Sequence, residues 1–207
     1  MRLIRIFYKV ARLILYKIDY FISWIVTLIK FSLNGVKFKN DFIARGIPVV
    51  NVNLKGKFVI GKRFEFKSGR YHNMIGRQQP CFFIVGEGAE LFVGDNVGIS
   101  ATALICYNKI VIGNNVKIGG NVVIYDTDFH ALDPFQRNAI PEITGNVKTA
   151  PVFINDGAFI GAHSTILKGV TIGRNAIIGA CSVVVKNVPD GQIWAGNPAR
   201  LIKSEIV

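Results

Sequence analysis

The residues best suited to chemistry lie close together in the segment 122–145. Asp126, Asp128 and His130 occur at a point where the regular aliphatic and glycine pattern on either side stops. In an extended chain successive side chains alternate between faces, so all three are expected on one face. A neutral imidazole accepts a proton near neutral pH, and a neighbouring carboxylate can orient the ring and stabilise its charged form. The spacing predicts acid–base chemistry with His130 as general base, although a surface histidine at the foot of a loop would have the same sequence.

The two aspartates leave more than one interpretation open. Either Asp126 or Asp128 could orient His130, bind an acceptor hydroxyl or cap a turn. Together with Thr127 they also spell the D-x-D that many glycosyltransferases use to hold a divalent metal. That tripeptide is short and no nucleotide-binding α/β pattern surrounds it, so we predict no metal site.

The stretch after His130 is predicted to be a long loop. Residues 131–150 contain two prolines and no regular spacing of aliphatic residues. A loop of this length inside a regular fold is usually functional. We therefore expect a protrusion at about 129–151 that covers the site and contacts the acceptor, with Arg137 available for an anionic group. A disordered excursion is the alternative.

The elements that must position this loop are predicted by a period of six residues. Aliphatic side chains recur at every sixth position in two blocks, with one extra residue near 107–109; the positions are Val93, Ile99, Ile105, Ile112, Ile118 and Ile124, and then Ile154, Ile160, Ile166, Ile172, Ile178 and Val184. This period fits neither a helix nor a long alternating strand. It fits a repeated short strand and turn, with one inward side chain per unit and Gly or Asn where the turn needs a positive φ. Stacked coils of this kind bury a continuous aliphatic column, so the sequence predicts a β-helix.

The repeat divides the chain into four parts. We expect a basic amphipathic helix, irregular or early coils of low fidelity, the β-helix body and a C-terminal segment, at 1–35, 36–84, 85–190 and 191–207 respectively. The three cysteines lack metal-ligand spacing and imply no disulfide framework, so a reducing compartment is the default. Two of them fall within the repeat, where small residues are expected to pack.

The first thirty-three residues have the pattern of a basic amphipathic helix, with polar side chains at every third or fourth position. The longest stretch without a charge, residues 20–29, is shorter than the roughly 20 residues that a bilayer-spanning helix needs. Residues 1–80 carry 16 Lys and Arg against 3 Asp and Glu, whereas residues 81–207 carry 9 against 10. We therefore expect peripheral membrane contact through residues 1–33, with packing on the body or on other copies as the alternative.

The hexapeptide pattern and the ending GACSVVVKNVPDGQIWAGNPARLIK resemble the left-handed β-helix acyltransferases. The resemblance is to the maltose and galactoside O-acetyltransferase group and related capsule-polysaccharide O-acetyltransferases, and it covers roughly residues 85–203. It implies a left-handed helix, a homotrimer with active sites in clefts between subunits, and acetyl-CoA as the acyl donor. The resembling enzymes carry their catalytic base just before the protruding loop, a position that His130 occupies.

The resemblance also implies which residues bind the two substrates. Asn121 matches an acceptor-contacting asparagine, although turn asparagines are common in hexapeptides. The positions that correspond to the donor site are Phe159, Gly161, Ala162, Gly179, Ala180, Val185 and Lys186, with Arg200 and Lys203 near the donor's phosphates. Lys168 replaces the proline of an LPGVTIG-type motif and adds a candidate phosphate contact. Each lysine could instead be a solvated surface charge.

These observations favour an acetyl-CoA-dependent O-acetyltransferase that acts on a saccharide, such as a polysaccharide or lipid-linked precursor, at the cytoplasmic face of a membrane. His130 would remove the hydroxyl proton for direct attack on the thioester, since no nucleophile elbow indicates a covalent intermediate. Two alternatives stay open: transfer to an amino-sugar nitrogen or another small molecule, and a non-catalytic β-helix scaffold at the membrane. Nucleic acid is not an expected partner, because the positive charge is interleaved with aliphatic residues and no aromatic stacking motif accompanies it.

Overall fold

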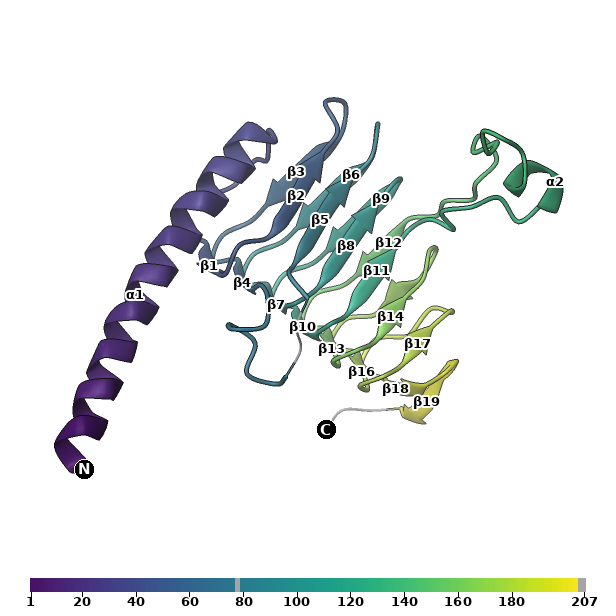
Figure 1. The fold of residues 1–207 in the computed structure, drawn as a ribbon. Coiled ribbons are helices and arrows are strands. Elements are labelled where there is room, and N and C mark those ends of the chain that lie inside the picture. The colour runs from purple at the N-terminus through teal and green to yellow at the C-terminus, as the bar shows by residue number, and fades with distance from the viewer. Residues whose placement is uncertain (77–78, 205–207) are drawn as a thin grey trace.

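The chain forms a parallel β-helix with a long α-helix at one end and a loop that projects from its side (Figure 1). This computed structural model describes residues 1–76 and 79–204. The predicted β-helix, its N-terminal helix and the protruding loop are thus confirmed.

Three sheets run along the solenoid, and each strand from β1 to β14 pairs in parallel with the third strand after it. The largest sheet contains β1 (Ile43–Arg45), β4 (Glu65–Lys67), β7 (Gly98–Ser100), β10 (Lys117–Gly120), β13 (Phe159–Ile160), β16 (Ile177–Ile178), β18 (Ile193–Gly196) and β19 (Ala199–Lys203). The second contains β2 (Val49–Val52), β5 (Phe82–Val85), β8 (Ala103–Cys106), β11 (Val123–Tyr125), β14 (Thr165–Ile166) and β17 (Val183–Val184). The third contains β3 (Lys57–Ile60), β6 (Glu90–Val93), β9 (Lys109–Ile112), β12 (Val152–Ile154) and β15 (Thr171–Ile172). The last two strands of the chain, β18 and β19, form an antiparallel hairpin.

The six-residue period corresponds to one strand and one corner of the solenoid. Successive aliphatic positions pair in register along each sheet, and in the largest sheet Ile99, Ile118, Ile160 and Ile178 are at most 3% exposed. Each coil therefore contributes inward side chains to one continuous core, as the period predicts.

The corners of the solenoid explain the glycines and asparagines of the repeat. Gly161 stacks so closely on the next coil that a Cβ there would lie 2.5 Å from the backbone nitrogen of Ala180. At another corner the Oδ1 atoms of Asn114 and Asp156 accept the backbone N–H groups of Asp95 and Asn114, at 2.8 and 2.7 Å. Small residues and side-chain acceptors at these places allow the coils to stack without unpaired backbone donors.

The long helix α1 (Arg2–Leu33) closes the first coil of the solenoid with its C-terminal part. Phe31 is fully buried, and its ring lies within 6.4 Å of the rings of Phe58, Phe66 and Phe83. Aromatic side chains fill the inward positions of the coils nearest to α1, which is why the six-residue aliphatic pattern is weak before residue 84. The N-terminal part of α1 extends beyond the solenoid (Figure 1). Within the described residues, no helix is long and apolar enough to cross a membrane.

The loop leaves the solenoid between β11 and β12, where two short stretches of chain run side by side as a stem. The backbone N–H of Asp128 donates to Lys148 at 3.1 Å, and that of Ala150 donates to Asp126 at 2.9 Å. The far end contains the short helix α2 (Pro134–Arg137). The loop is therefore an ordered excursion with its base fixed on the solenoid.

Candidate active site at the base of the loop

His130 lies at the base of the loop, and the structure pairs it with Glu142. Its Nδ1 is 2.9 Å from Oε2 of Glu142, while the other carboxylate oxygen accepts the backbone N–H of Ala131 at 3.3 Å. The His130 side chain is 66% exposed and that of Glu142 is 24% exposed. A carboxylate on Nδ1 fixes the ring and leaves Nε2 as the nitrogen that can accept a proton.

The electrostatics of the pair favour a charged Glu142. The hydrogen bond to His130 holds the pKa of the Glu142 carboxyl below its usual range, and the N–H of Ala131 and the charge of Arg137 act in the same direction. Sequence reasoning did not single out Glu142, because it lies twelve residues from His130 in a stretch with no periodic signal. Its only signal is that it is one of two acidic residues in the loop.

Asp126 has a different position from His130, because its side chain turns into the solenoid. It is fully buried, and its two oxygens accept the backbone N–H groups of Tyr107 and Asn108 at 2.7 and 2.8 Å. These two residues belong to the place where the repeat gains one residue. The carboxylate therefore satisfies the backbone donors that the extra residue leaves without strand partners.

Asp128 forms an ion pair with Lys168 instead of contacting His130. Lys168 Nζ lies 2.6 Å from Asp128 Oδ1, and both side chains are partly buried. Phe129 separates Asp128 from His130 with a positive φ of 64°, so the chain is not extended here and the expected alternation of faces fails. The pair ties the loop stem to the next coil and engages the lysine that was expected near a phosphate.

Arg137 is engaged in the loop, whereas Asn121 occupies a corner of the solenoid with its buried Oδ1 unpaired within the described part of the chain. Arg137 donates from Nη1 to the carbonyl oxygens of Ala131 and Leu132, at 3.1 and 3.0 Å, which holds the loop in shape. Asn121 has a φ of 59° at the corner between β10 and β11, a conformation that asparagine tolerates better than most residues. Its side chain does not reach His130 through any hydrogen bond among the described residues.

The residues expected around the acyl donor lie on the last coils of the solenoid. Phe159 is 46% exposed on β13, and Val185 is 43% exposed after β17. The pairs Gly161–Ala162 and Gly179–Ala180 form equivalent corners of successive coils, and Lys186, Arg200 and Lys203 are exposed farther along. These positions form part of one end of the solenoid, and the two glycines are also required for stacking.

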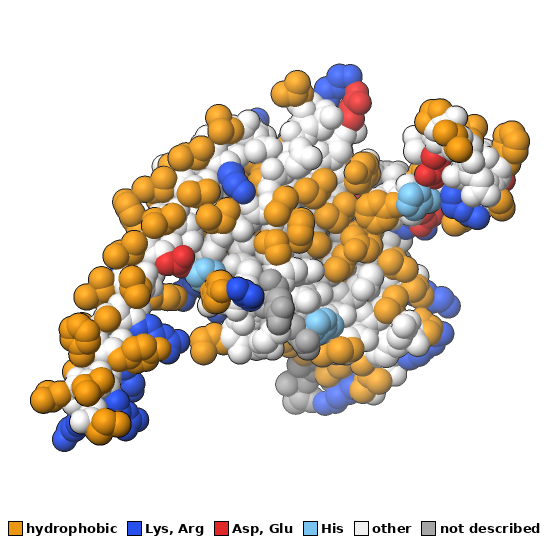
Figure 2. Space-filling view, in the orientation of Figure 1, with side chains coloured by type: hydrophobic (Ala, Val, Ile, Leu, Met, Phe, Trp, Pro, Cys, Tyr) orange, Lys and Arg blue, Asp and Glu red, His pale blue; other side chains and the backbone are white. Residues whose placement is uncertain are grey.

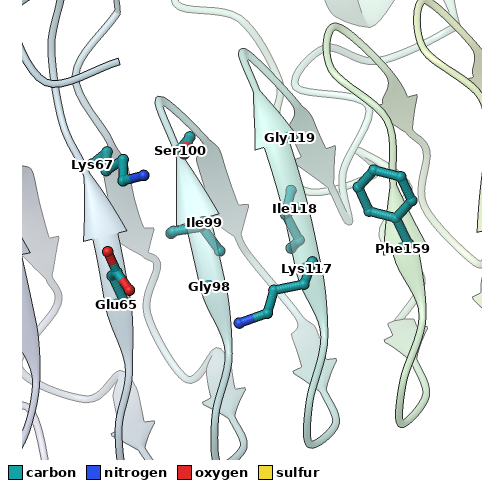
Figure 3. A pocket seen from close by; sticks show the side chains of 9 residues that line it. All are labelled: Glu65, Lys67, Gly98, Ile99, Ser100, Lys117, Ile118, Gly119 and Phe159. Atoms are coloured by element: carbon teal, nitrogen blue, oxygen red, sulfur yellow. The ribbon is translucent and has the colours of Figure 1, made fainter. Parts of the chain in front are cut away.

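A shallow cavity of about 240 Å³ opens next to Phe159 on the outer face of the largest sheet (Figure 3). Gly98 and Gly119 form its floor, and Lys67 and Lys117 bring ammonium groups to it. The sequence did not mark these lysines, because outward positions of the repeat carry no periodic signal. The cavity is lined by the aromatic ring of Phe159, the ammonium groups of Lys67 and Lys117 and the carboxylate of Glu65.

The buried Cys106 thiol, which lies beside Asp126, is not a candidate nucleophile. Burial raises the pKa of the Cys106 thiol, and the neighbouring Asp126 carboxylate raises it further, so the thiol stays protonated. Cys181, expected to pack inside the repeat, is exposed at a corner instead. Among residues 1–76 and 79–204, no group of three or more His, Cys, Asp or Glu side chains could hold a metal ion.

The fold and the repeat define a hexapeptide-repeat solenoid. Residues 151–186 match the family model described as bacterial transferase hexapeptide, six repeats. The galactoside O-acetyltransferase of Escherichia coli is 32% identical over 128 residues, which cover 61% of this chain and 59% of that protein.

Two solved structures are similar to this chain in fold. A hexapeptide-repeat-containing acetyltransferase from Vibrio cholerae has a TM-score of 0.51 and 31% identity, over 56% of this chain and 64% of that one. A variant of an N-acyltransferase from Bacillus cereus, solved with an amino-sugar nucleotide and coenzyme A, has a TM-score of 0.61 and 22% identity over 83% and 84% of the two chains. The resemblance to the left-handed β-helix hexapeptide-repeat acyltransferases is therefore confirmed. The chain spans between 53% and 62% of the length of the curated relatives that it matches.

Proposed function

We propose that this protein is an O-acetyltransferase that moves an acetyl group from acetyl-CoA to a hydroxyl of a saccharide. The observation that carries this proposal is the exposed His130 ring at the base of the loop, with Nδ1 on the Glu142 carboxylate. This arrangement provides a base for a hydroxyl proton at a place that a substrate can reach. The sequence similarity to a galactoside O-acetyltransferase supports a sugar hydroxyl as the acceptor.

In the proposed reaction, Nε2 of His130 takes the proton from the acceptor hydroxyl while the hydroxyl oxygen attacks the thioester carbonyl carbon. The carbon–sulfur bond then breaks, and the coenzyme A thiolate leaves and takes the proton back from the imidazolium. Both substrates are bound together, so positioning supplies much of the acceleration. The Glu142 carboxylate acts as a positioning residue, because it orients the ring and stabilises the charged imidazolium.

The acyl donor is proposed to lie along the exposed end of the solenoid that carries Phe159 and the corners at Gly161 and Gly179. The pantetheine arm is proposed to bond to the backbone at those corners, and the exposed Arg200 and Lys203 offer cations to its phosphates. Lys168 is already paired with Asp128, so its part in phosphate binding would require that pair to open.

The active site is proposed to be completed by a second subunit of a homotrimer. The loop extends away from its own solenoid, and its far end exposes Phe135 at 80% and Ile140 at 99%. A neighbouring solenoid would cover these side chains and form the second wall of the cleft. The donor and acceptor would then meet between subunits.

The protein is proposed to work at the cytoplasmic surface of a membrane, to which α1 attaches it. The side of α1 that packs on the solenoid buries Ser23, Thr27 and Phe31. Lys30 on the same side donates to the carbonyl of Pro48 at 2.8 Å. The opposite side exposes apolar residues, including Ile18 at 51% and Phe21 at 60%. A helix packed on a domain normally buries its apolar residues and exposes its polar ones. The exposed apolar side of α1 therefore suits contact with an apolar phase such as a lipid interface.

A thiol-release assay with acetyl-CoA and a panel of mono- and oligosaccharides tests the activity. We expect His130→Ala to reduce the rate at least about 100-fold, the usual scale of a general base. Asp133→Asn, an exposed change on the same loop, is the matched control and should keep the rate. If the wild type releases thiol only with amino sugars, the acceptor is a nitrogen; if it releases none above background and His130→Ala changes nothing, the scaffold reading replaces this proposal.

A further inference from the structure

A second exposed apolar surface lies beside α1, in the segment 69–76 that follows β4. Tyr71, Met74 and Ile75 are 79%, 94% and 59% exposed. In Figure 1 this segment hangs from the solenoid on the side toward which the free N-terminal part of α1 points. Three large apolar side chains at one loop tip are more than the scattered exposure that is normal for a protein surface.

The segment is fixed to α1 by specific contacts. Nε2 of His72 lies 3.3 Å from Oδ2 of Asp19, and the His72 side chain is only 12% exposed. The ring packs against Gly46, where a Cβ would lie 2.6 Å from its Cδ2. Ser23 of α1 accepts the backbone N–H of Gly46 at 3.1 Å, so helix, strand end and loop meet at one junction. The loop tip and α1 therefore keep a fixed relation to each other.

The free N-terminal part of α1 and Arg70 of the loop carry charges that favour an anionic partner. Arg2, Arg5, Lys9 and Arg12 precede the first acidic residue of α1, Asp19. Figure 2 shows these basic and apolar side chains together at the free end of the helix. Arg70, next to the exposed Tyr71, adds another cation at the loop. A second copy of the chain would bring like charges together, whereas an anionic lipid surface is complementary to them.

We propose that residues 70–75 form a second lipid contact, so that the protein docks on an anionic membrane at two points, α1 and this loop. The proposal rests on the membrane attachment proposed above, not on the acetyl-transfer activity. A single amphipathic helix leaves the protein free to roll about the helix axis. The second contact removes that freedom and sets the orientation of the solenoid, and therefore of the projecting loop, relative to the membrane.

An environment-sensitive label at the loop tip tests this directly. In a Cys181→Ser background the two other thiols, Cys81 and Cys106, are fully buried, so Met74→Cys supplies the one reactive position among described residues. An NBD label there should gain intensity and shift to the blue with vesicles that contain phosphatidylglycerol, and much less with pure phosphatidylcholine. The same label at Phe7→Cys reports α1, and at Leu54→Cys, which lies in an exposed turn, it should not respond.

Each outcome decides the proposal. A response at positions 7 and 74, but not at 54, supports it. A response at position 7 alone overturns the loop contact and leaves α1 as the membrane contact. No response at either position overturns both membrane proposals, while the thiol-release assay still decides the activity. A response at position 74 that needs no vesicles and grows with protein concentration would show that a second copy covers the loop.

Placing negative charges at the loop tip provides a measurement that needs no label. Met74→Asp combined with Ile75→Asp should weaken co-sedimentation with the phosphatidylglycerol vesicles about tenfold, because two apolar side chains no longer enter the interface. Leu54→Asp places the same change on a surface away from the junction and should leave binding unchanged. Equal binding of the double variant and the wild type would contradict the two-point contact.

Discussion

At the scale of single residues, the three carboxylates near the candidate site have different partners. Glu142 contacts His130, whereas Asp126 and Asp128 stabilise the coil corner and the loop stem. Because the pKa of Glu142 is lowered in the folded protein, its pair with His130 stabilises the fold above the ordinary carboxyl range. This contribution is lost as pH falls through the folded-state pKa of Glu142.

Glu142→Gln tests the positioning role. The amide still fits but carries no charge, so we expect kcat to fall by about 10- to 100-fold with little change in the KM for acetyl-CoA. Because the wild-type carboxylate loses its charge as pH falls through the lowered pKa of Glu142, the difference between the two proteins should shrink at acid pH. A matched pH–rate profile of both proteins measures this. A uniform loss at every pH, with a lower unfolding temperature, would point to a structural role only.

Asp126→Asn tests the assignment of Asp126 to the fold. The amide has one oxygen to accept with, so a buried N–H of Tyr107 or Asn108 loses its acceptor. We expect the free energy of unfolding to drop by about 2 kcal/mol. Chemical denaturation measures the change, with Asp133→Asn, at the exposed start of α2, as the control. An unchanged midpoint together with a large loss of activity would return Asp126 to the reaction.

At the scale of elements, α1 both packs on the solenoid and exposes an apolar surface. Its last turns close the solenoid and cover the end strands, which would otherwise expose the aromatic core. Earlier turns carry an apolar surface that the solenoid does not cover. Of the two alternatives that the sequence left open, packing on the body is observed for one side of the helix. Membrane contact through the exposed side remains a proposal.

Phe31→Ala tests the packing of α1 on the solenoid, and Phe21→Ala tests its exposed apolar surface. Phe31 is fully buried, so its truncation should lower the free energy of unfolding by about 3–5 kcal/mol. Phe21 is 60% exposed, so the same change there should leave stability unaltered and reduce vesicle binding. Denaturation and co-sedimentation of both variants provide the measurements. Destabilisation by Phe21→Ala as large as that by Phe31→Ala would show that the exposed face is covered within the protein.

At the scale of the whole molecule, the solenoid holds the loop and α1 at separate places and gives each a fixed direction (Figure 1). The proposed reaction needs a second wall for the cleft, which the loop's exposed far end indicates but a single chain does not supply. Oligomeric state is therefore part of the catalytic proposal.

Sedimentation equilibrium tests that assembly. We expect a species of three 22.8-kDa chains. Phe135→Ser with Ile140→Ser should shift it toward monomer and lower activity in parallel, because both side chains would lose their cover on the neighbouring subunit. Asp133→Asn, on the same loop, keeps the apolar tip and serves as the control. A monomer that retains full activity would contradict the shared site.

The sequence by itself determined the solenoid, because a six-residue period imposes one inward side chain per strand and is repeated often enough to be unambiguous. It also located His130, since the break in that period marks where the chain leaves the coil. Only the tertiary structure decided which carboxylate orients His130, because the positive φ at Phe129 turns the chain and the loop folds back to bring Glu142 beside the ring. It likewise decided which side of α1 meets the solenoid: amphipathic spacing defines two faces, and the side that is buried carries Ser23, Thr27 and Phe31. Local periodicity fixes repeats, whereas contacts across a loop or between distant elements depend on how the whole chain closes.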